Sequence, residues 1–288
     1  MPSYSHSKIK TYEQCPLKFK YKYIDRVTPE IDKTIEAHLG QAVHDTLEWI
    51  YSQNQPPSID EAIQKYIEFW KEKWTENIRI VKEEKSPKDY FNKGIQFLTE
   101  YYPKHYPFDD GTLECEKKVK IEIGQDGKYK VYGFIDRLVY NYKTSEYEIH
   151  DYKTSSTFPS QEEMEQERQL ALYSIGLKDE YGYEKEVKLI WHFLEHGKEI
   201  QVKKKNDQLE KLKQETLEKI REIETATYFP RNESILCYWC EFRNRCGEDK
   251  RKEQEEKNKK EKPNSDYVSI EDNSWFNAQG KEDQKRLF

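Results

Sequence analysis

The stretch GFIDRLVYNYKTSEYEIHDYKTSS, residues 133–156, constrains the fold more than any other part of the sequence. Its two apolar runs, separated by a short polar turn, predict two β-strands that pair as a hairpin. Side chains alternate between the faces of a strand, so Asp151 and Lys153 point the same way. Asp136 comes within reach of Asp151 if the strands pair. The hairpin therefore predicts two carboxylates and one lysine at the same place.

Such a group is costly in apolar strands unless another charge balances it. A divalent cation between Asp136 and Asp151 would provide that balance, because Mg²⁺ is held by one or two carboxylates together with phosphate and water. Lys153 could then orient an attacking water and offset the charge of a phosphate. The alternative is structural: Asp136 pairs with a base such as Arg137, and Asp151 and Lys153 form a solvated strand end.

Composition limits the classes of protein that fit. Charged residues make up 36% of the 288 positions and the mean hydropathy is −1.13, yet 14% aromatic content argues against wholesale disorder. The 22 tyrosines can supply amphipathic surface and stack on nucleic-acid bases. Because the net charge is −6, any contact with DNA must come from local basic patches or a bound metal.

Targeting and redox signals point to a cytoplasmic protein. The sequence has no signal-peptide pattern and no run of 18 apolar residues, so we expect neither secretion nor a membrane span. The five cysteines are then expected to be reduced thiols or metal ligands rather than disulfides.

Periodicity predicts an α/β chain. A helix at 5–26 is capped by Ser5 or Ser7, with Pro16 starting a new turn after Cys15, and a helix at 35–52 has His44 at the edge of its apolar stripe. The remaining elements are helices at about 60–82 and 88–102, a strand at 112–123 with Leu113 and Cys115 facing inward and Glu116 outward, a helix at 161–180, strands at 186–195 and 199–204, and a helix at 206–226. Gln169 and Tyr173 share one face of their helix.

The C-terminal part has two distinctive segments. Cys237, Cys240 and Cys246 form C-x2-C-x5-C within residues 229–247, a pattern typical of a zinc or iron–sulfur site. No histidine lies nearby, so the fourth ligand would be Cys15, from the more exposed context, or Cys115. Beyond them, residues 250–288 form a charged tail that we expect to be flexible.

Together these motifs resemble the RecB-like branch of the PD-(D/E)XK nucleases, and within it the members with a four-cysteine iron–sulfur cluster, such as AddB nuclease domains and CRISPR-associated adaptation nucleases. The matching residues are His44 in GQAVH, Asp136 in GFIDR, Asp151 and Lys153 in DYK, Gln169 and Tyr173 in QLALY, and Cys15 with Cys237, Cys240 and Cys246. One departure is that Asp151 stands where glutamate is commoner, which shortens the carboxylate.

The resemblance implies a restriction-endonuclease-like fold, a mixed central sheet flanked by helices, for a nuclease domain at 1–249. It has a helical insertion at 55–105 and a cluster-binding segment at 229–247. It also implies that His44, Asp136, Asp151 and the backbone carbonyl of Tyr152 bind Mg²⁺ or Mn²⁺. Lys153 would position water, Gln169 and Tyr173 would hold the lysine or the DNA, and Cys15, Cys237, Cys240 and Cys246 would bind a [4Fe–4S] cluster.

The function implied is a metal-dependent DNA exonuclease for single-stranded or frayed ends, in repair, recombination or CRISPR adaptation, with a helicase or adaptation-complex partner and a nucleoid-associated location. The terminal residues Gln284, Leu287 and Phe288 resemble a peptide that docks into sliding clamps, whereas a tail packed on its own domain is the alternative. A catalytically inert DNA-binding or scaffold subunit, and a zinc-stapled interaction protein, are the competing functions.

Overall fold

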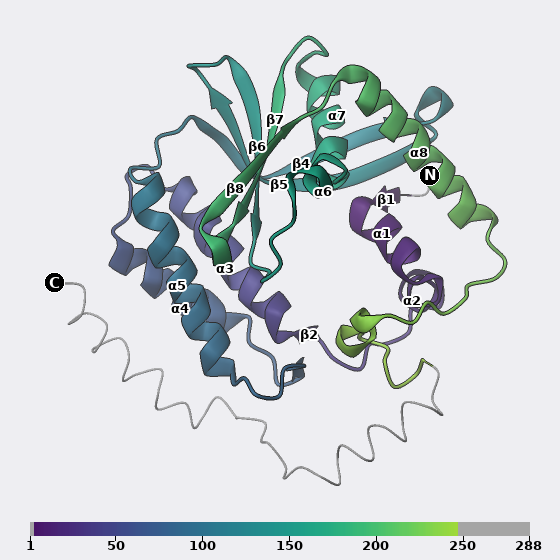
Figure 1. The fold of residues 1–288 in the computed structure, drawn as a ribbon, viewed down its shortest axis with the longest axis horizontal. Coiled ribbons are helices and arrows are strands. Elements are labelled where there is room, and N and C mark those ends of the chain that lie inside the picture. The colour runs from purple at the N-terminus through teal and green to yellow at the C-terminus, as the bar shows by residue number, and fades with distance from the viewer. Residues whose placement is uncertain (1–2, 247–288) are drawn as a thin grey trace, which may run out of the picture.

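The structure is a computed structural model that describes residues 3–246. Its fold is a mixed α/β arrangement (Figure 1). The strands are β1 (Ser3–Ser5), β2 (Lys33–Thr34), β3 (Ile78–Arg79), β4 (Thr112–Ile123), β5 (Tyr129–Asn141), β6 (Glu146–Lys153), β7 (Val187–Phe193) and β8 (Lys198–Lys203). The α-helices are α1 (His6–Gln14), α2 (Pro16–Phe19), α3 (Ile35–Ser52), α4 (Ile59–Glu72), α5 (Pro87–His105), α6 (Gln161–Glu165), α7 (Gln169–Tyr181) and α8 (Asn206–Thr225). Short π and 3₁₀ turns are η1 (Lys20–Ile24), η2 (Gln125–Gly127), η3 (Leu194–His196) and η4 (Ile235–Trp239).

Strand β5 organises the central sheet. β4 pairs with it antiparallel along nearly its whole length, while β1 and β6 share its other edge. β1 pairs parallel with residues 130–132 of β5, and β6 pairs antiparallel with residues 137–141. β6 continues into a parallel pairing with β7, and β7 pairs antiparallel with β8. The predicted hairpin and the predicted mixed sheet are therefore confirmed.

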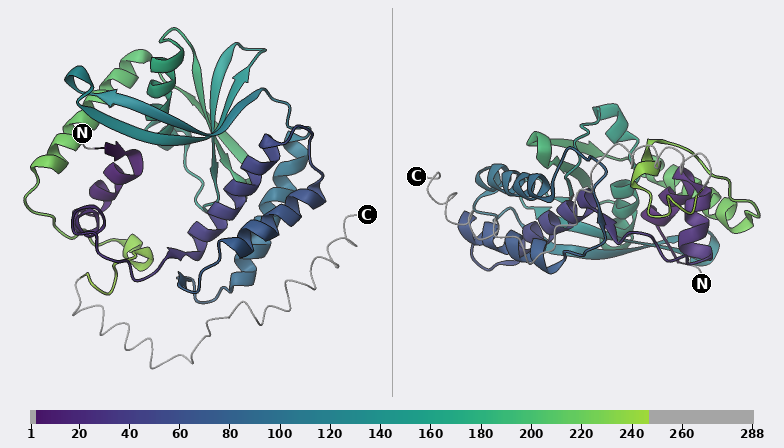
Figure 2. Two further views of the ribbon diagram at one scale, coloured as in Figure 1. Left: turned by 180° about the vertical axis from the view of Figure 1, so that it is seen from behind. Right: turned by 90° about the horizontal axis from the view of Figure 1, so that it is seen from below.

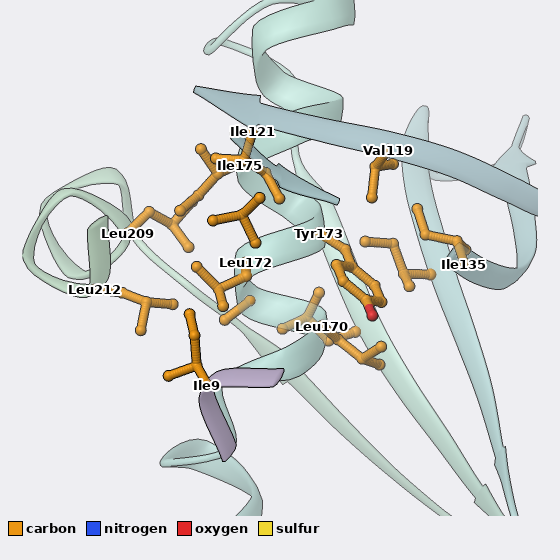
Figure 3. Packing of buried hydrophobic residues seen from close by; sticks show 14 of the residues in the cluster. Ile9, Val119, Ile121, Ile135, Leu170, Leu172, Tyr173, Ile175, Leu209 and Leu212 are labelled. Atoms are coloured by element: carbon orange, nitrogen blue, oxygen red, sulfur yellow. The ribbon is translucent and has the colours of Figure 1, made fainter. Parts of the chain in front are cut away.

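Two hydrophobic cores lie against the sheet. One is built from β4–β8 with α1, α7 and α8, and Figure 3 shows Leu172 and Ile175 of α7 packed between Ile121 of β4 and Leu209 and Leu212 of α8. The other is formed by α3, α4 and α5 together with Tyr152 and Leu194. In Figures 1 and 2 these two groups of helices lie on opposite sides of the central strands.

Helix α3 follows the sequence prediction closely. The Thr34 side chain caps it by accepting a hydrogen bond from the amide of Ala37, and its apolar stripe, including Val43 and Leu47, is fully buried. The burial of this stripe against α4 and α5 fixes the rotation of the helix. His44, beside the stripe, is thereby directed toward the sheet.

Three local predictions were wrong. The helix expected to reach residue 82 ends at Glu72, because the chain then pairs β3 with β2. The helix expected over 161–180 is interrupted, because the Glu167 carboxylate accepts the amide hydrogens of Gln169 and Leu170 and starts α7 there. Leu113, expected to face inward, is 49% exposed beside an irregularity in the β4–β5 register.

Both ends of the described chain meet. The amide of Leu17 in α2 donates to the carbonyl of Pro230, and the Asn232 side chain donates to the carbonyl of Gln14. Figure 2 shows the yellow-green C-terminal segment beside the purple N-terminal helices. No helix among residues 3–246 is both long and apolar enough to cross a membrane. The predicted flexible tail, with Gln284, Leu287 and Phe288, lies outside the described residues.

A Gly133→Ala substitution is expected to lower the free energy of unfolding by about 1–3 kcal/mol, the usual cost of overpacking a core. A Cβ atom at Gly133 would lie 2.0 Å from the Tyr173 ring, and Tyr173 is itself buried. Urea denaturation would measure the change. Gly40→Ala is the matched control, since its Cβ meets only the Thr154 hydroxyl at 3.2 Å, and equal losses in both variants would contradict the packing argument.

Candidate active site at the fork between β5 and β6

The candidate site lies where β5 and β6 separate. The last pair between the two strands joins Arg137 to His150, so Asp136 of β5 and Asp151 of β6 are the first residues beyond the pairing. From there β6 pairs only with β7. A strand edge that leaves its partner exposes backbone groups that need new partners. The fork therefore leaves backbone groups of β6 without a β5 partner beside two carboxylates.

Asp136 closes the fork with its side chain. Its Oδ2 accepts the amide hydrogen of Tyr152 at 2.9 Å and lies 3.3 Å from His44 Nδ1. Burial, followed by the negative charge of Asp151, raises the pKa of Asp136 to about 6. A carboxylate in this state gains from any added positive charge.

His44 reaches the fork from α3. Its Nε2 lies 2.7 Å from the carbonyl oxygen of Tyr152, which can only accept, so this nitrogen donates. His44 thus contacts both Asp136 and the Tyr152 carbonyl. The family resemblance implies that these three groups bind one metal ion, and the structure brings all three together.

Asp151 and Lys153 form an ion pair on the other side of the Tyr152 peptide. Lys153 Nζ lies 2.6 Å from Asp151 Oδ2, although this buried oxygen lacks a partner in good hydrogen-bond geometry among the described residues. Burial lowers the pKa of Lys153, but the charge of Asp151 outweighs it, and the pKa is raised overall. The lysine is held charged beside the carboxylate, as the shared strand face predicted.

Gln169 and Tyr173 line the same region from α7. Gln169 Nε2 donates to the Tyr173 hydroxyl at 3.4 Å. Burial raises the pKa of Tyr173, and the hydrogen bond from Gln169 opposes this rise. The charges of Asp151 and Asp136 raise the pKa further, because the phenol lies near both carboxylates. The predicted pair therefore contacts the site from the helix that packs on Gly133.

Sequence reasoning missed three neighbours of the site. Glu116 is exposed, as expected, and burial of part of its side chain followed by the charges of Asp136 and Glu48 raises its pKa. The β4–β5 register places Glu116 across from Asp136, so the two side chains share one face of the sheet. Glu167 lies near Lys153 while it caps α7. His6 is buried, and burial and nearby lysines and arginine, Lys153 among them, lower its pKa to about 4.

The donor atoms suit a divalent ion. An imidazole nitrogen, two carboxylates and a backbone carbonyl form a hard, mostly oxygen ligand set, appropriate for Mg²⁺ or Mn²⁺. In the described part of the chain, however, the donor atoms of His44, Asp136 and Asp151 do not all lie within 4.8 Å of one another.

A second cluster joins the two ends of the described chain. Cys15, Cys237, Cys240 and Cys246 line one cavity of about 40 Å³ beside α2 and η4. Cys115 is elsewhere, near Arg137, and burial raises its pKa to about 11. Of the two candidates for the fourth thiolate, the structure places Cys15 with the other three.

The spacing of these thiols bears on what could bind. Four thiolates around one zinc ion, with bonds of about 2.3 Å, have sulfurs about 3.8 Å apart. Within residues 3–246, no three cysteine sulfurs lie within 4.8 Å of one another. Among the described residues, the four thiols therefore share one cavity without the close spacing of a formed zinc site.

The comparisons with known proteins identify the class. A sequence model of the PD-(D/E)XK nuclease superfamily matches residues 3–247, most of the chain. The chain belongs to the PD-(D/E)XK nuclease superfamily, whose members are nucleases that use divalent metal ions. Its mixed sheet flanked by helices agrees with the restriction-endonuclease-like fold of that superfamily. A search of curated proteins gives no match.

Solved structures are similar at a lower level. The protein SSO0001 is 15% identical with a TM-score of 0.36, over 83% of this chain and 93% of that one. A candidate exonuclease from Eubacterium rectale is 11% identical with a TM-score of 0.47, over 92% of this chain and 91% of that one.

The raised pKa of Asp136 predicts an effect on stability. A folded-state pKa of about 6, above the unfolded value of 3.8, stabilises the fold below pH 4 and this contribution is lost as the pH rises through 6. Asp136→Asn should therefore raise the free energy of unfolding of metal-free protein at pH 8, by on the order of 1–2 kcal/mol.

Urea denaturation in a chelator at several pH values measures this difference. The gain should shrink between pH 6 and pH 4, where wild-type Asp136 becomes protonated. A gain that stays constant with pH would show that the carboxyl charge is not its cause.

Proposed function

We propose that this protein is a Mg²⁺- or Mn²⁺-dependent deoxyribonuclease that digests single-stranded or frayed DNA ends as an exonuclease. The observation that carries the proposal is the meeting of His44, Asp136 and the Tyr152 peptide on one side of the fork with the Asp151–Lys153 pair on the other. An isolated strand end would need none of these contacts.

The roles of the residues follow from their chemistry. His44, Asp136, Asp151 and the carbonyl of Tyr152 would hold the divalent ion, which when bound supplies positive charge to a phosphoryl oxygen and lowers the pKa of a bound water. Lys153 would orient the attacking water and share the charge of the phosphate. Gln169 and Tyr173 would position Lys153 or the DNA backbone from α7.

Exposed aromatic side chains near the fork support an unpaired substrate. Phe134, two residues before Asp136, is 53% exposed. Phe158 is 39% exposed and packs on Phe193, the β7 partner of Lys153, at a ring distance of 5.1 Å. Stacking of this kind is available to single-stranded bases, whereas bases in a duplex are already stacked.

The finer assignments rest on the RecB-like resemblance. We place the enzyme in DNA repair, recombination or CRISPR adaptation, in the cytoplasm at the nucleoid, with residues 1–249 as the nuclease domain and 55–105 as an insertion in it. A helicase or adaptation complex would supply the ends, since the sequence has no nucleotide-binding loop. Gln284, Leu287 and Phe288 would dock on a sliding clamp.

Substitution of the paired residues should abolish cleavage. Lys153→Met and Asp151→Asn are each expected to lower the rate at least about 100-fold, the usual contribution of a positioned catalytic group. The assay compares end-labelled single- and double-stranded DNA with Mg²⁺, with Mn²⁺ and without metal. Lys120→Met, at an exposed lysine of β4 paired with Glu122, is the matched control.

Each outcome bears on the proposal. Loss in Lys153→Met and Asp151→Asn with activity kept in Lys120→Met supports the assigned site. Cleavage that persists in both variants, or that needs no metal, would contradict it. DNA binding without cleavage in the wild type would favour the inert DNA-binding or scaffold subunit.

We propose further that Cys15, Cys237, Cys240 and Cys246 bind one [4Fe–4S] cluster with a structural role. The cavity that the four thiols share supports it. Thiolates are the protein ligands of such clusters. Closing the chain between α2 and the C-terminal segment restricts the unfolded state, as a long cross-link does.

The cluster proposal predicts different effects of two cysteine substitutions. Anaerobically purified wild type should be brown and contain about four iron atoms per chain. Cys115→Ser, outside the cavity, should keep the iron, and Cys15→Ser should lose most of it. A colourless wild type with one zinc per chain would instead support the zinc-stapled interaction protein.

A further inference from the structure

A group of metal-ligating side chains lies apart from both sites described above. His105 at the end of α5, His192 of β7 and Glu199 of β8 bring one ligand atom each within 4.8 Å of one another. Among residues 3–246 no other group of three such residues does so. Glu199 Oε1 lies 2.9 Å from His192 Nδ1 and 3.7 Å from His105 Nε2.

The hydrogen-bond chain behind this group fixes the state of His192. Arg137 Nη2 lies 2.9 Å from His150 Nδ1, and a guanidinium can only donate, so His150 Nδ1 accepts. The same His150 Nδ1 lies 2.8 Å from His192 Nε2, which must therefore carry the hydrogen. In a neutral His192 this leaves the lone pair of Nδ1 facing the carboxylate of Glu199.

A lone pair and a carboxylate oxygen 2.9 Å apart repel each other unless a cation lies between or beside them. A second proton on His192 is one solution, and it would make an ordinary imidazolium–carboxylate pair with no need for His105. A metal ion is the other, and it uses all three side chains.

The surroundings favour a bound ion. His105 is stacked on Tyr101 at a ring distance of 3.8 Å, which holds its imidazole in place. The three side chains line a cavity of about 40 Å³, enough for an ion and a water.

Two lysines also line this cavity, and both are engaged elsewhere. Lys104 Nζ donates to the carbonyl of Gly197, and Lys198 Nζ lies 5.3 Å from the centre of the Phe158 ring. Their charges are thus directed away from the ligand atoms. The net charge of the three ligand side chains, with both imidazoles neutral, therefore remains negative.

We propose that His105, His192 and Glu199 form a site for one divalent transition-metal ion, with zinc the best fit, which ties α5 to β7 and β8. Two imidazoles and a carboxylate are a known zinc ligand set, and bonds of about 2.1 Å to a tetrahedral ion separate the ligand atoms by about 3.4 Å. The observed 2.9 and 3.7 Å lie on either side of that value.

The hydrogen bond between His192 and His150 completes the arrangement. A metal-binding imidazole usually donates its other nitrogen to an acceptor that orients the ring. His150, fixed by Arg137, is that acceptor for His192. The site needs nothing from the nuclease centre, and the proposal holds whether or not the protein cleaves DNA.

The test counts zinc in the full-length protein. Wild type, His105→Gln, Glu199→Gln and His196→Gln are stripped with a chelator, given excess zinc, desalted and analysed for metal. His196 is an exposed histidine that contacts the Ser156 carbonyl instead of this cluster, so its variant is the matched control. Any zinc at the cysteines or the nuclease centre is common to all four proteins and cancels in the comparison.

Wild type and His196→Gln should each retain one zinc ion per chain more than His105→Gln and Glu199→Gln. Their zinc affinity at this site, measured by competition with a coloured chelator, should exceed that of the two variants at least about 100-fold. Cobalt bound there should lack sulfur-to-metal absorption. Equal zinc in all four folded proteins would overturn the proposal and leave an imidazolium–carboxylate pair at His192 and Glu199.

Discussion

The peptide unit of Tyr152 is the point on which the candidate active site depends. Its amide hydrogen is donated to Asp136 at 2.9 Å, and its carbonyl oxygen accepts from His44 at 2.7 Å. Because β6 has already left β5 at this position, these two side chains take the place of the missing strand partner. One peptide thereby fixes the distance between α3, β5 and β6, and it sets Asp151 and Lys153 on either side of itself.

The Tyr152 side chain continues these contacts into the hydrophobic core formed with α3, α4 and α5. Its hydroxyl accepts from Arg137 Nε at 2.8 Å, and Arg137 is fully buried and also bound to Asp110 and His150. A buried guanidinium is tolerated only when its donors are satisfied, and here at least three of them are. The contacts of Arg137 therefore connect the nuclease fork to the histidine cluster of β7 and β8.

Sequence reasoning predicted the parts of the site that depend on strand alternation and motif order. Asp151 and Lys153 share a face because of period-2 alternation, and Asp136 lies opposite because the strands form a hairpin. Gln169 and Tyr173 are neighbours because they are four residues apart on a helix. These relations depend only on residues close together in the sequence, so they do not depend on how the rest of the chain packs.

What the sequence did not predict depends on exceptions to those periods or on contacts between distant segments. Glu116 was correctly assigned to solvent, but only the β4–β5 register shows that it lies across from Asp136. The break at Glu167 reflects a side chain that caps α7, which no apolar pattern reports. His105, His192 and Glu199 come from three separate elements, and only the packing of α5 on the sheet joins them.

The electrostatics of the fork explain why a protein with a net charge of −6 would still approach DNA there. Asp136, Asp151 and Glu167 lie near Lys153, so carboxylates outnumber the ammonium. Burial, followed by the charge of Asp151, raises the pKa of Asp136. A phosphate entering this field alone would be repelled. A divalent ion reverses the sign at the point where the phosphate must bind, so the same carboxylates that repel DNA without metal would recruit it with metal. In the proposed enzyme, metal binding would control substrate binding as well as chemistry.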